Sequence, residues 1–295
     1  MDISVVTITK RWGGVDVAVD ALKRQNFEGL FEWILVDEHY SERRKEVGDY
    51  VKAVMPNTPF THTPPKMRKT IRKYGLINAL NTGLLRARGE LIVWLQDYIW
   101  CIPTALDRYW KAYDAFPHRL IGGLKDHYSW AQPDDPKGKV SLWSKPWEGD
   151  PEGKAILTER DDRYKSIKAE PDAVLVESIP IVYEMCNASM PYALAVALNG
   201  ADEAYDNGRG YDNQNVSFRA TGLGYQTVID MHNIAREFNH WEWFGLDDKV
   251  SPPSVGGKPA PDTNYELHGR TMQAIRDGKY PLRAPNDFAL TPLGE

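Results

Sequence analysis

NALNTGLLRARGELIVWLQDYIWCIPTAL, residues 78–106, is the stretch with the clearest structural pattern in the chain. Its first part, residues 78–88, has apolar side chains at the three- and four-residue spacing that is typical of a helix. Gly89 predicts the end of this helix, because glycine readily adopts a left-handed backbone. Leu91 to Leu95 is a continuous apolar run, which predicts a strand that is buried on both faces. A second helix is predicted over residues 104–115.

An acidic residue follows this buried strand, in the stretch Gln96 to Tyr98. Open α/β sheets bind their ligands at the carboxyl ends of the strands. Asp97 is therefore the first candidate for a ligand-binding residue. A second predicted strand, residues 31–36, ends in the same way, in Asp37.

Strands alternate with helices along the amino-terminal part of the chain. Residues 3–9 and 31–36 are rich in β-branched and aromatic side chains and predict strands, whereas residues 15–25 and 41–55 predict helices. This alternation is typical of βαβ units with right-handed crossovers. The sequence therefore predicts an α/β protein with a mostly parallel central sheet flanked by helices.

The pattern is less regular in the second half. Residues 127–172 lack periodicity, so we expect either a functional loop or a small inserted β-element there. Residues 251–262 have the composition of a linker. The remaining predicted elements are strands at 119–124, 174–183 and 227–229, and helices at 191–198, 212–221 and 265–276.

The composition is that of a folded globular protein. The chain has 295 residues, of which 42% are hydrophobic and 26% charged, and its net charge is −5. This balance gives no overall basic field that would attract nucleic acid, although the run from Lys66 to Lys73 is locally basic. Cys101 and Cys186 have no metal-ligand spacing and imply no disulfide framework. Without an apolar run long enough for a membrane span and without a signal peptide, we expect a soluble cytoplasmic protein.

Several stretches, taken together and in their order, resemble one known family. SVVTITKR (residues 4–11) resembles the family's opening strand and loop, and ILVDE (residues 34–38) resembles its second strand. NALNTGLLRARGELIVWLQDY resembles its central helix and acidic strand end, and NASMPYALAVALNGADEAYDNGRGYDNQNVSFRATGLGY (residues 187–225) resembles its later stretch. The chain thus resembles the family 2 glycosyltransferases, which have the Rossmann-like GT-A fold. The resemblance covers roughly residues 2–126 and 180–242.

This resemblance implies a nucleotide-sugar donor, with UDP as the expected nucleotide. It implies that Asp37 contacts the uracil or the ribose, and that Asp97 lies at the diphosphate. The basic run supplies two further candidates for diphosphate binding, Arg72 and Lys73. The full set of expected donor-binding residues is Thr7, Thr9, Arg11, Asp37, Arg72, Lys73, Asn81, Gln96 and Asp97.

The resemblance also implies a divalent cation, Mn²⁺ or Mg²⁺, that neutralises the departing diphosphate. The family's D-x-D motif is here Gln96-Asp97-Tyr98, so only Asp97 remains as an acidic ligand. His240 is expected to complete the cation site, with His232 as the alternative. Cationic side chains could instead replace the metal, and the candidates are Arg68, Arg72 and Lys73.

An inverting transfer needs a carboxylate that takes the proton from the acceptor hydroxyl. The family's acidic pair is here Asp212-Asn213, and an amide cannot act as a base. The resemblance therefore implies Asp212 as the catalytic base, although a carboxylate there would also suit the start of a helix. The acceptor side is expected to include Asp202, Glu203 and Trp130.

The sequence predicts one GT-A domain over residues 1–245 and a C-terminal extension over residues 246–295. Within the domain, residues 1–126 are expected to bind the donor and residues 127–245 the acceptor. The acceptor is an unidentified hydroxyl compound, which could be a glycan, a small molecule, a protein or a modified nucleobase. Two rivals stay open: a sugar-phosphate nucleotidyltransferase, and a non-catalytic protein that binds a nucleotide sugar.

Overall fold

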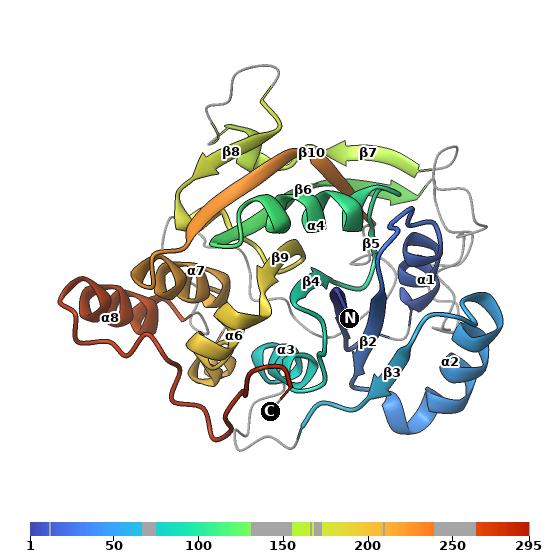
Figure 1. Ribbon diagram of the computed structural model, residues 1–295, viewed down its shortest axis with the longest axis horizontal. Helices are drawn as coiled ribbons and strands as arrows, with labels where there is room; N and C mark the ends of the chain where they lie inside the picture. The colour runs from blue at the N-terminus through green and yellow to red at the C-terminus, as the bar shows by residue number, and fades with distance from the viewer. Residues whose placement is uncertain are drawn as a thin grey trace.

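The computed structural model describes most of the chain, and every structural statement below concerns that part. The described residues are 1–11, 13–66, 75–130, 155–165, 167, 173–208, 210–238 and 264–294. The strands are β1 (Ile3–Thr9), β2 (Phe31–Asp37), β3 (Phe60–Thr63), β4 (Leu91–Leu95), β5 (Ile99–Trp100), β6 (Arg119–Trp130), β7 (Ala155–Glu159), β8 (Leu175–Ser178), β9 (Asn187–Pro191) and β10 (Gln226–Phe238). The helices are α1 (Val15–Lys23), α2 (Tyr40–Val54), α3 (Leu76–Leu84), α4 (Ala105–Ala115), α6 (Tyr192–Leu198), α7 (Asp212–Gly222) and α8 (Tyr265–Arg276), with short 3₁₀ helices η1 (Asp162–Lys165), η2 (Pro180–Val182) and η3 (Glu203–Asn207) (Figure 1).

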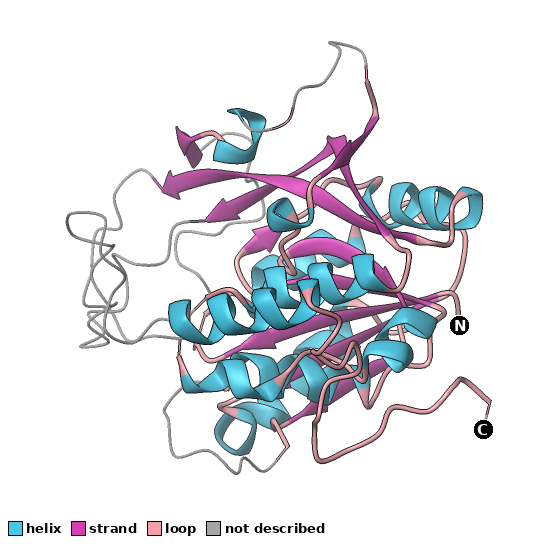
Figure 2. Ribbon diagram, turned by 90° about the vertical axis from the view of Figure 1, so that its left-hand side faces the viewer, coloured by secondary structure: helices cyan, strands magenta, loops and turns pink. Residues whose placement is uncertain are grey.

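The described strands form one mixed sheet with the order β3-β2-β1-β4-β9-β6-β10-β5, to which β7 adds beside β6 and β8 beside β10. The pairings among β3, β2, β1 and β4 are parallel, as is that of β6 with β10. β9 runs antiparallel between β4 and β6. Figure 2 shows the long strands running away from the amino terminus, so that their carboxyl ends share one edge. The predicted α/β architecture with a helix-flanked central sheet is confirmed.

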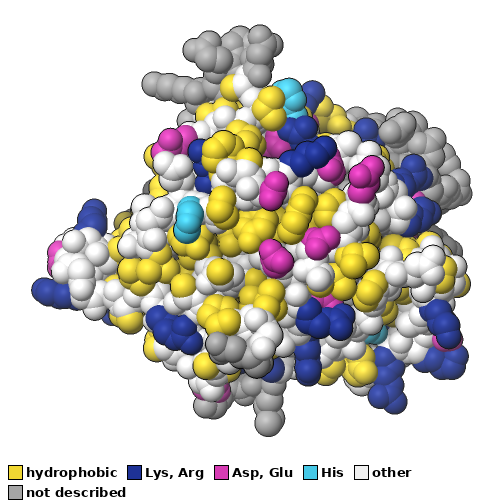
Figure 3. Space-filling view, in the orientation of Figure 1, with side chains coloured by type: hydrophobic (Ala, Val, Ile, Leu, Met, Phe, Trp, Pro, Cys, Tyr) yellow, Lys and Arg dark blue, Asp and Glu magenta, His cyan; other side chains and the backbone are white. Residues whose placement is uncertain are grey.

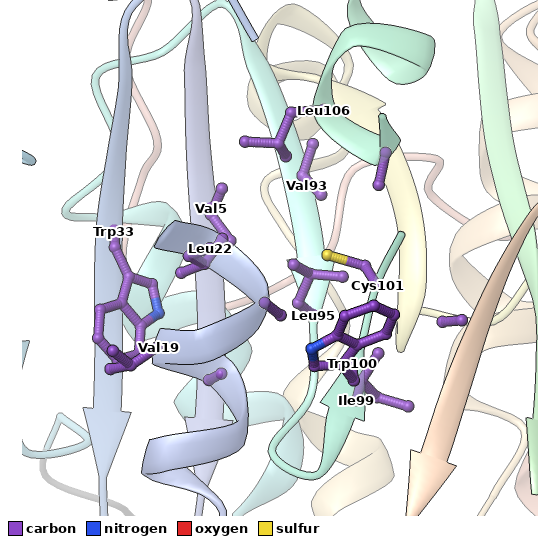
Figure 4. Close-up of a cluster of buried hydrophobic side chains, with 14 of the residues drawn as sticks. Val5, Val19, Leu22, Trp33, Val93, Leu95, Ile99, Trp100, Cys101 and Leu106 are labelled. Atoms are coloured by element: carbon purple, nitrogen blue, oxygen red, sulfur yellow. The ribbon is translucent and has the colours of Figure 1, made fainter. Parts of the chain in front are cut away.

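Two hydrophobic cores lie on opposite faces of this sheet because successive strand residues point to opposite sides. On one face, alternate residues of β1 and β4 contact α1, α2 and α4. Figure 4 shows this core, with Val19 and Leu22 of α1 beside Val5, Trp33 and Val93. On the other face, the intervening strand residues contact α3, α6 and α7. The continuous apolar run of β4 supplies both cores, as predicted from the sequence.

The sequence prediction was incomplete in the second half. It gave no strand at β9, whose residues Asn187 to Pro191 include small and polar side chains but are all buried. It also made β6 and β10 too short. Within the stretch predicted to be irregular, residues 127–172, β7 is the inserted β-element and pairs antiparallel with β6. Residues 131–154 of that stretch lie outside the described part of the chain.

The C-terminal segment packs back onto the sheet domain. Its backbone binds the turn after α6, through the Ala284 N–H to the Leu198 carbonyl at 2.7 Å and the Leu290 N–H to Asn199 Oδ1 at 2.9 Å. Asn286 donates to the carbonyls of Asn199 and Ala201, each at 2.8 Å. The predicted boundary at residue 246 stays a prediction, but the final segment shares hydrogen bonds with the domain before it.

The amino-terminal edge of the sheet faces the viewer in Figure 3, where hydrophobic side chains gather at the centre with charged side chains around them. Leu30, Phe116 and Leu223, in the loops before β2, β6 and β10, are exposed. None of the described helices has the length and apolar character needed to cross a membrane. Acidic strand ends lie at the other, carboxyl edge, which therefore holds the candidate site.

Gly89 is needed for a reason that differs from the prediction. α3 ends earlier, at Leu84, and Gly89 is not among the glycines with a positive φ. Its N–H donates to Ser4 Oγ at 2.8 Å, and a Cβ on it would lie 2.4 Å from the Ser4 nitrogen. Ser4 Oγ in turn donates to the buried Glu32 at 2.7 Å. Glycine is required because the turn before β4 approaches β1 so closely.

We therefore expect Gly89→Ala to lower the free energy of unfolding by about 1–3 kcal/mol, since the added methyl group must push β1 and the turn apart. Gly48→Ala is the matched control, because Gly48 lies inside α2 with open space around it. Alanine there should raise the stability by roughly 0.5–1 kcal/mol through its helix propensity. Urea denaturation measures both variants, and equal stability of the two would contradict this account.

Candidate active site

The parallel register brings three strand ends to one edge of the sheet. Thr9, the last residue of β1, lies opposite Asp37, the last residue of β2. β4 pairs with β1 on its other side and leads directly into Asp97. Three residues that are far apart in the sequence therefore meet where open α/β sheets place their ligands.

Asp97 is held from two sides by β1 and the loop that follows it. Thr9 Oγ1 donates to Asp97 Oδ2 at 2.7 Å, and the Arg11 guanidinium forms an ion pair with Asp97 Oδ1. The side chain of Asp97 is 5% exposed and that of Arg11 is 17% exposed. The guanidinium carbon lies 5.8 Å from the centre of the Tyr98 ring. Three predicted donor-binding residues, Thr9, Arg11 and Asp97, are thus in direct contact with one another.

Tyr98 occupies the second acidic position of the D-x-D motif and turns inward. Its backbone has φ 62°, and its side chain is almost fully buried. The ring packs on Gly14, where a Cβ would lie 2.8 Å from two ring carbons. The Phe238 N–H at the end of β10 donates to the Tyr98 carbonyl at 3.0 Å. The position after Asp97 therefore supplies an aromatic side chain to the core.

Asp37 is completely buried and fully engaged. Its carboxylate accepts from Arg43 Nε and Nη2, both at 2.7 Å, from His62 Nε2 at 2.8 Å, and from the His39 N–H at 2.8 Å. Burial alone would raise the pKa of Asp37, but the hydrogen bonds from His62 and Arg43 outweigh it and hold the pKa below its ordinary value. Its expected contact with the base or ribose stays a prediction, and these partners show that Asp37 also orders the end of β2.

Asp212 is the first residue of α7, and two hydrogen bonds connect the start of this helix to the same edge of the sheet. The neighbouring Asn213 Oδ1 accepts from the Met185 N–H at 3.0 Å. The next residue, Cys186, accepts at its carbonyl from the Gln96 N–H at 3.1 Å. Asp212 is 8% exposed, and burial raises its pKa to about 6, with a further contribution from the negative charge of Glu184. A carboxylate with this pKa is largely ionised at neutral pH and can still accept a proton.

A partly buried lysine, Lys125, lies beside this region, and it was not predicted from the sequence. Lys125 Nζ forms ion pairs with Glu237 at 2.6 Å and with Glu184 at 3.8 Å. Burial disfavours the charged form, but Cys186, Glu237 and Glu184 more than offset it, so the pKa of Lys125 is raised. The sequence signal was a charged residue directly after the apolar run of β6. These side chains set the charge around Glu184, whose negative charge in turn raises the pKa of Asp212.

Asn81 and Glu203 connect α3 with the loop after α6. Asn81 Nδ2 donates to the Ala201 carbonyl at 2.9 Å and to Glu203 Oε1 at 3.0 Å, while Asn81 Oδ1 accepts from the Ala201 N–H at 2.9 Å. Lys66 donates to Glu203 at 2.8 Å. The roles predicted for Asn81 at the donor and for Glu203 at the acceptor stay predictions. Both side chains form hydrogen bonds that hold the fold together.

Asp202 and Thr7 also have partners inside the protein. Asp202 accepts from the Ala204 N–H at 2.9 Å, and the Tyr280 hydroxyl donates to its other oxygen. Thr7 accepts at its hydroxyl from the Trp33 indole at 3.0 Å, and its side chain is buried. The expected acceptor role of Asp202 and the donor role of Thr7 are likewise untested by these contacts.

The described residues do not fit a divalent cation. Hard cations need several oxygen or imidazole ligands, but Asp97 is alone in the motif and is engaged by Thr9 and Arg11. His232 is exposed at a bulge within β10, and its N–H donates to Asp230 Oδ1 at 3.0 Å.

 His232 lies six residues before Phe238, where β10 ends, and its expected role as a metal ligand stays a prediction. Within the described ranges no group of three or more His, Cys, Asp and Glu side chains is arranged to hold a metal ion.

The side chains of five predicted residues lie outside the described part of the structure. His240, Arg72 and Lys73, together with the alternative Arg68, lie outside the described residues. Trp130 is the last residue of β6, and only its backbone is described. The roles expected for these residues therefore stay predictions.

The comparison with protein families gives one match and fits this geometry. The family model described as "Glycosyl transferase family 2" matches residues 4–166. This range includes β1, β2, β4 and Asp97 but ends before Asp212. No curated protein sequence matches the chain.

Solved structures show the same fold at low sequence identity. GalNAc-T7 with UDP, GalNAc and Mn²⁺ is 14% identical with a TM-score of 0.63, over 95% of this chain and 50% of that one. The mannosyltransferase PcManGT from Pyrobaculum calidifontis, with GDP-Man and Mn²⁺, is 16% identical with a TM-score of 0.57, over 95% and 65%. A fragment of S. aureus TarS in complex with UDP is 10% identical with a TM-score of 0.53, over 81% and 61%. The chain thus spans about half to two thirds of the length of these structures.

Asp37→Ala tests the structural role of the buried carboxylate. Removing it leaves the guanidinium of Arg43, which is 1% exposed, without its ion-pair partner. We expect the free energy of unfolding to fall by about 3–5 kcal/mol, measured by urea denaturation. Asp49→Ala is the control, because its ion pair with Lys45 is exposed and should be worth less than about 1 kcal/mol. Full stability of Asp37→Ala would show that the ion pair does not hold the end of β2.

Asp212→Asn tests the raised pKa through stability. In the folded protein the pKa of Asp212 is about 6, whereas an ordinary aspartate has a pKa of 3.8. Ionisation of Asp212 therefore destabilises the fold as the pH rises from about 4 to about 6. The variant should be more stable than the wild type by about 1–3 kcal/mol at pH 7.5, and should lose this advantage at pH 4.

Urea denaturation at the two pH values measures this difference. Asp107→Asn, at a partly exposed ion pair on α4, should change the stability by no more than about 0.5 kcal/mol at either pH. An Asp212→Asn variant with the same relative stability at pH 4 and pH 7.5 would show that the carboxyl titrates normally.

Proposed function

The chain belongs to glycosyl transferase family 2, and from that premise we propose that it transfers a sugar from a nucleotide donor to an acceptor hydroxyl with inversion. In this proposal Asp212 is the general base and the edge formed by Thr9, Arg11 and Asp97 binds the donor diphosphate. The observation that carries it is the contact of Asp97 with both the end of β1 and the loop beyond it, at the carboxyl edge of the sheet.

The donor side is supported by fold and position together. The structural neighbours include proteins solved with UDP and with GDP-Man. In the proposed site the diphosphate lies at the ends of β1 and β4, where the guanidinium of Arg11 is partly exposed. UDP is the nucleotide that the sequence resemblance favours, and it is the donor nucleotide of this proposal.

The base is supported by the environment of Asp212. Its carboxylate is buried and feels the negative charge of Glu184, and its pKa of about 6 makes it a stronger base than an ordinary aspartate. When the acceptor oxygen attacks the anomeric carbon, Asp212 takes the proton of that hydroxyl. Asn213 contributes structure, because its amide oxygen binds the Met185 N–H.

The predicted Mn²⁺ or Mg²⁺ is not given a step in this mechanism, since the described residues do not fit it. Relatives of this fold have been solved with Mn²⁺, so the dependence on a divalent cation is an experimental question. The acceptor is a hydroxyl compound whose class, whether glycan, small molecule, protein or modified nucleobase, is open.

Asp212→Asn should reduce sugar transfer by about 10²–10⁴-fold while it leaves UDP affinity within a few-fold, because it removes a proton acceptor and no diphosphate ligand. The measurement is UDP release from UDP-glucose, UDP-galactose and UDP-GlcNAc, with water as the acceptor, with and without Mn²⁺. Wild-type activity should rise with pH through about 6 and then level off.

Asp107→Asn serves again as the control and should keep full activity. Retained turnover of Asp212→Asn would remove Asp212 as the base. If the wild type bound UDP tightly but released none from any donor, the non-catalytic binding protein would be the better assignment.

A further inference from the structure

We propose that Arg11 supplies the positive charge that stabilises the departing diphosphate, in the role that the family resemblance gives to a divalent cation. This inference rests on the proposed function and assigns Arg11 as a catalytic residue of that reaction. From the sequence alone, Arg11 was expected only to bind the donor, and the side chains expected to replace the metal were Arg68, Arg72 and Lys73.

The first support is that the Arg11 guanidinium already lies where a metal ion would have to bind the Asp97 carboxylate. Its guanidinium forms an ion pair with Asp97 Oδ1, and Thr9 Oγ1 takes the other carboxylate oxygen. The Arg11 N–H also lies 3.2 Å from Thr9 Oγ1, so the loop is tied to the end of β1. A metal ion bound to Asp97 would have to displace a cation that is already in place.

The second support is that the other motif position provides no metal ligand. Tyr98 is buried against Gly14, and a guanidinium lies 5.8 Å from the ring centre. At this distance the ring favours a cation above its face. Asp97 and Tyr98 therefore form a binding site for a guanidinium, in which one carboxylate balances one positive charge.

The third support is the donor geometry of the guanidinium. Arginine has five N–H groups in a planar fork that matches the oxygens of a phosphate. Its contact with Asp97 uses one edge of that fork, and the side chain is 17% exposed. Among the described residues, Asp97 is its ion-pair partner, which leaves other N–H groups for a phosphate. A guanidinium held rigidly by a carboxylate also loses little side-chain freedom when the anion binds.

The reaction then balances as follows. The bond between the anomeric carbon and the diphosphate oxygen breaks, and its electron pair goes to that oxygen. The acceptor oxygen forms the new bond to the anomeric carbon, and its proton passes to Asp212. The negative charge that develops on the diphosphate is stabilised by N–H groups of Arg11.

Calorimetric titration with UDP in buffer containing EDTA tests the assignment. The wild type should bind UDP under these conditions, and Mn²⁺ in place of EDTA should change the affinity by less than about threefold. Arg11→Ala should weaken UDP binding by about ten- to a hundredfold, as expected for the loss of charge-assisted hydrogen bonds. Binding of uridine, which lacks the diphosphate, should be unchanged, and Arg11→Lys should recover part of the UDP affinity.

Arg24→Ala is the matched control. Arg24 also pairs with an aspartate, Asp20, but it follows α1 at the opposite end from Gly14, and Lys23 shares the same partner. This variant should bind UDP as the wild type does. Thermal unfolding of all variants checks that each one folds, and Arg11→Lys keeps the test valid if Arg11→Ala does not.

The outcomes separate this inference from the proposed function. If EDTA abolished UDP binding and Mn²⁺ restored it in the wild type, the metal would supply the charge and the assignment of Arg11 would fall. Unchanged UDP affinity in Arg11→Ala would overturn it as well, while the glycosyltransferase proposal would stand. If the wild type bound neither UDP nor GDP with or without Mn²⁺, the proposed function and this inference would fail together.

Discussion

The parallel pairing of β1 with both of its neighbours is the constraint on which the candidate site depends. Backbone hydrogen bonds hold Thr9 opposite Asp37 on one side and Val6 opposite Trp94 on the other. Because the three strands run in the same direction, their ends must meet at one edge. Asp97, which is 88 residues from Thr9 in the chain, thereby reaches the Thr9 hydroxyl at 2.7 Å. A one-residue slip of β4 would turn its side chains to the opposite faces and break this contact.

β9 extends the same edge into the second half of the chain. It lies between β4 and β6 and runs antiparallel to both, so its amino end meets their carboxyl ends. The residues just before β9 therefore enter the site: Cys186 binds Gln96, and Met185 binds Asn213. The position of Asp212 follows from the sheet topology as much as from the helix that it begins.

Much of the fold could be predicted from the sequence, because β-branched runs and helical periodicity mark β1, β2, β4 and their helices. β9 was missed because its small and polar residues have no strand pattern of their own, and it is a strand only because β4 and β6 cover it. Asp97 and Asp212 were found through motifs, because a motif is a pattern of residues that are close together in the sequence. Their partners could not be found in this way, because Arg11 meets Asp97 across 86 residues and only the sheet register joins them. The need for Gly89 was likewise a matter of tertiary contact, with Ser4.

The contrast between Asp37 and Asp212 shows what the sequence cannot supply. Both are aspartates at the ends of predicted elements, and both are buried. Arg43 and His62 hydrogen-bond to Asp37 and favour its charged form, so its pKa falls and the carboxylate stays ionised near neutral pH. Asp212 has no ion pair with any described lysine or arginine, and burial together with Glu184 favours its protonated form. A general base must be able to gain a proton in the reaction. The surroundings of the two carboxylates therefore favour a structural role for Asp37 and support the proposal that Asp212 takes the proton, although their sequence contexts looked equally suited to function.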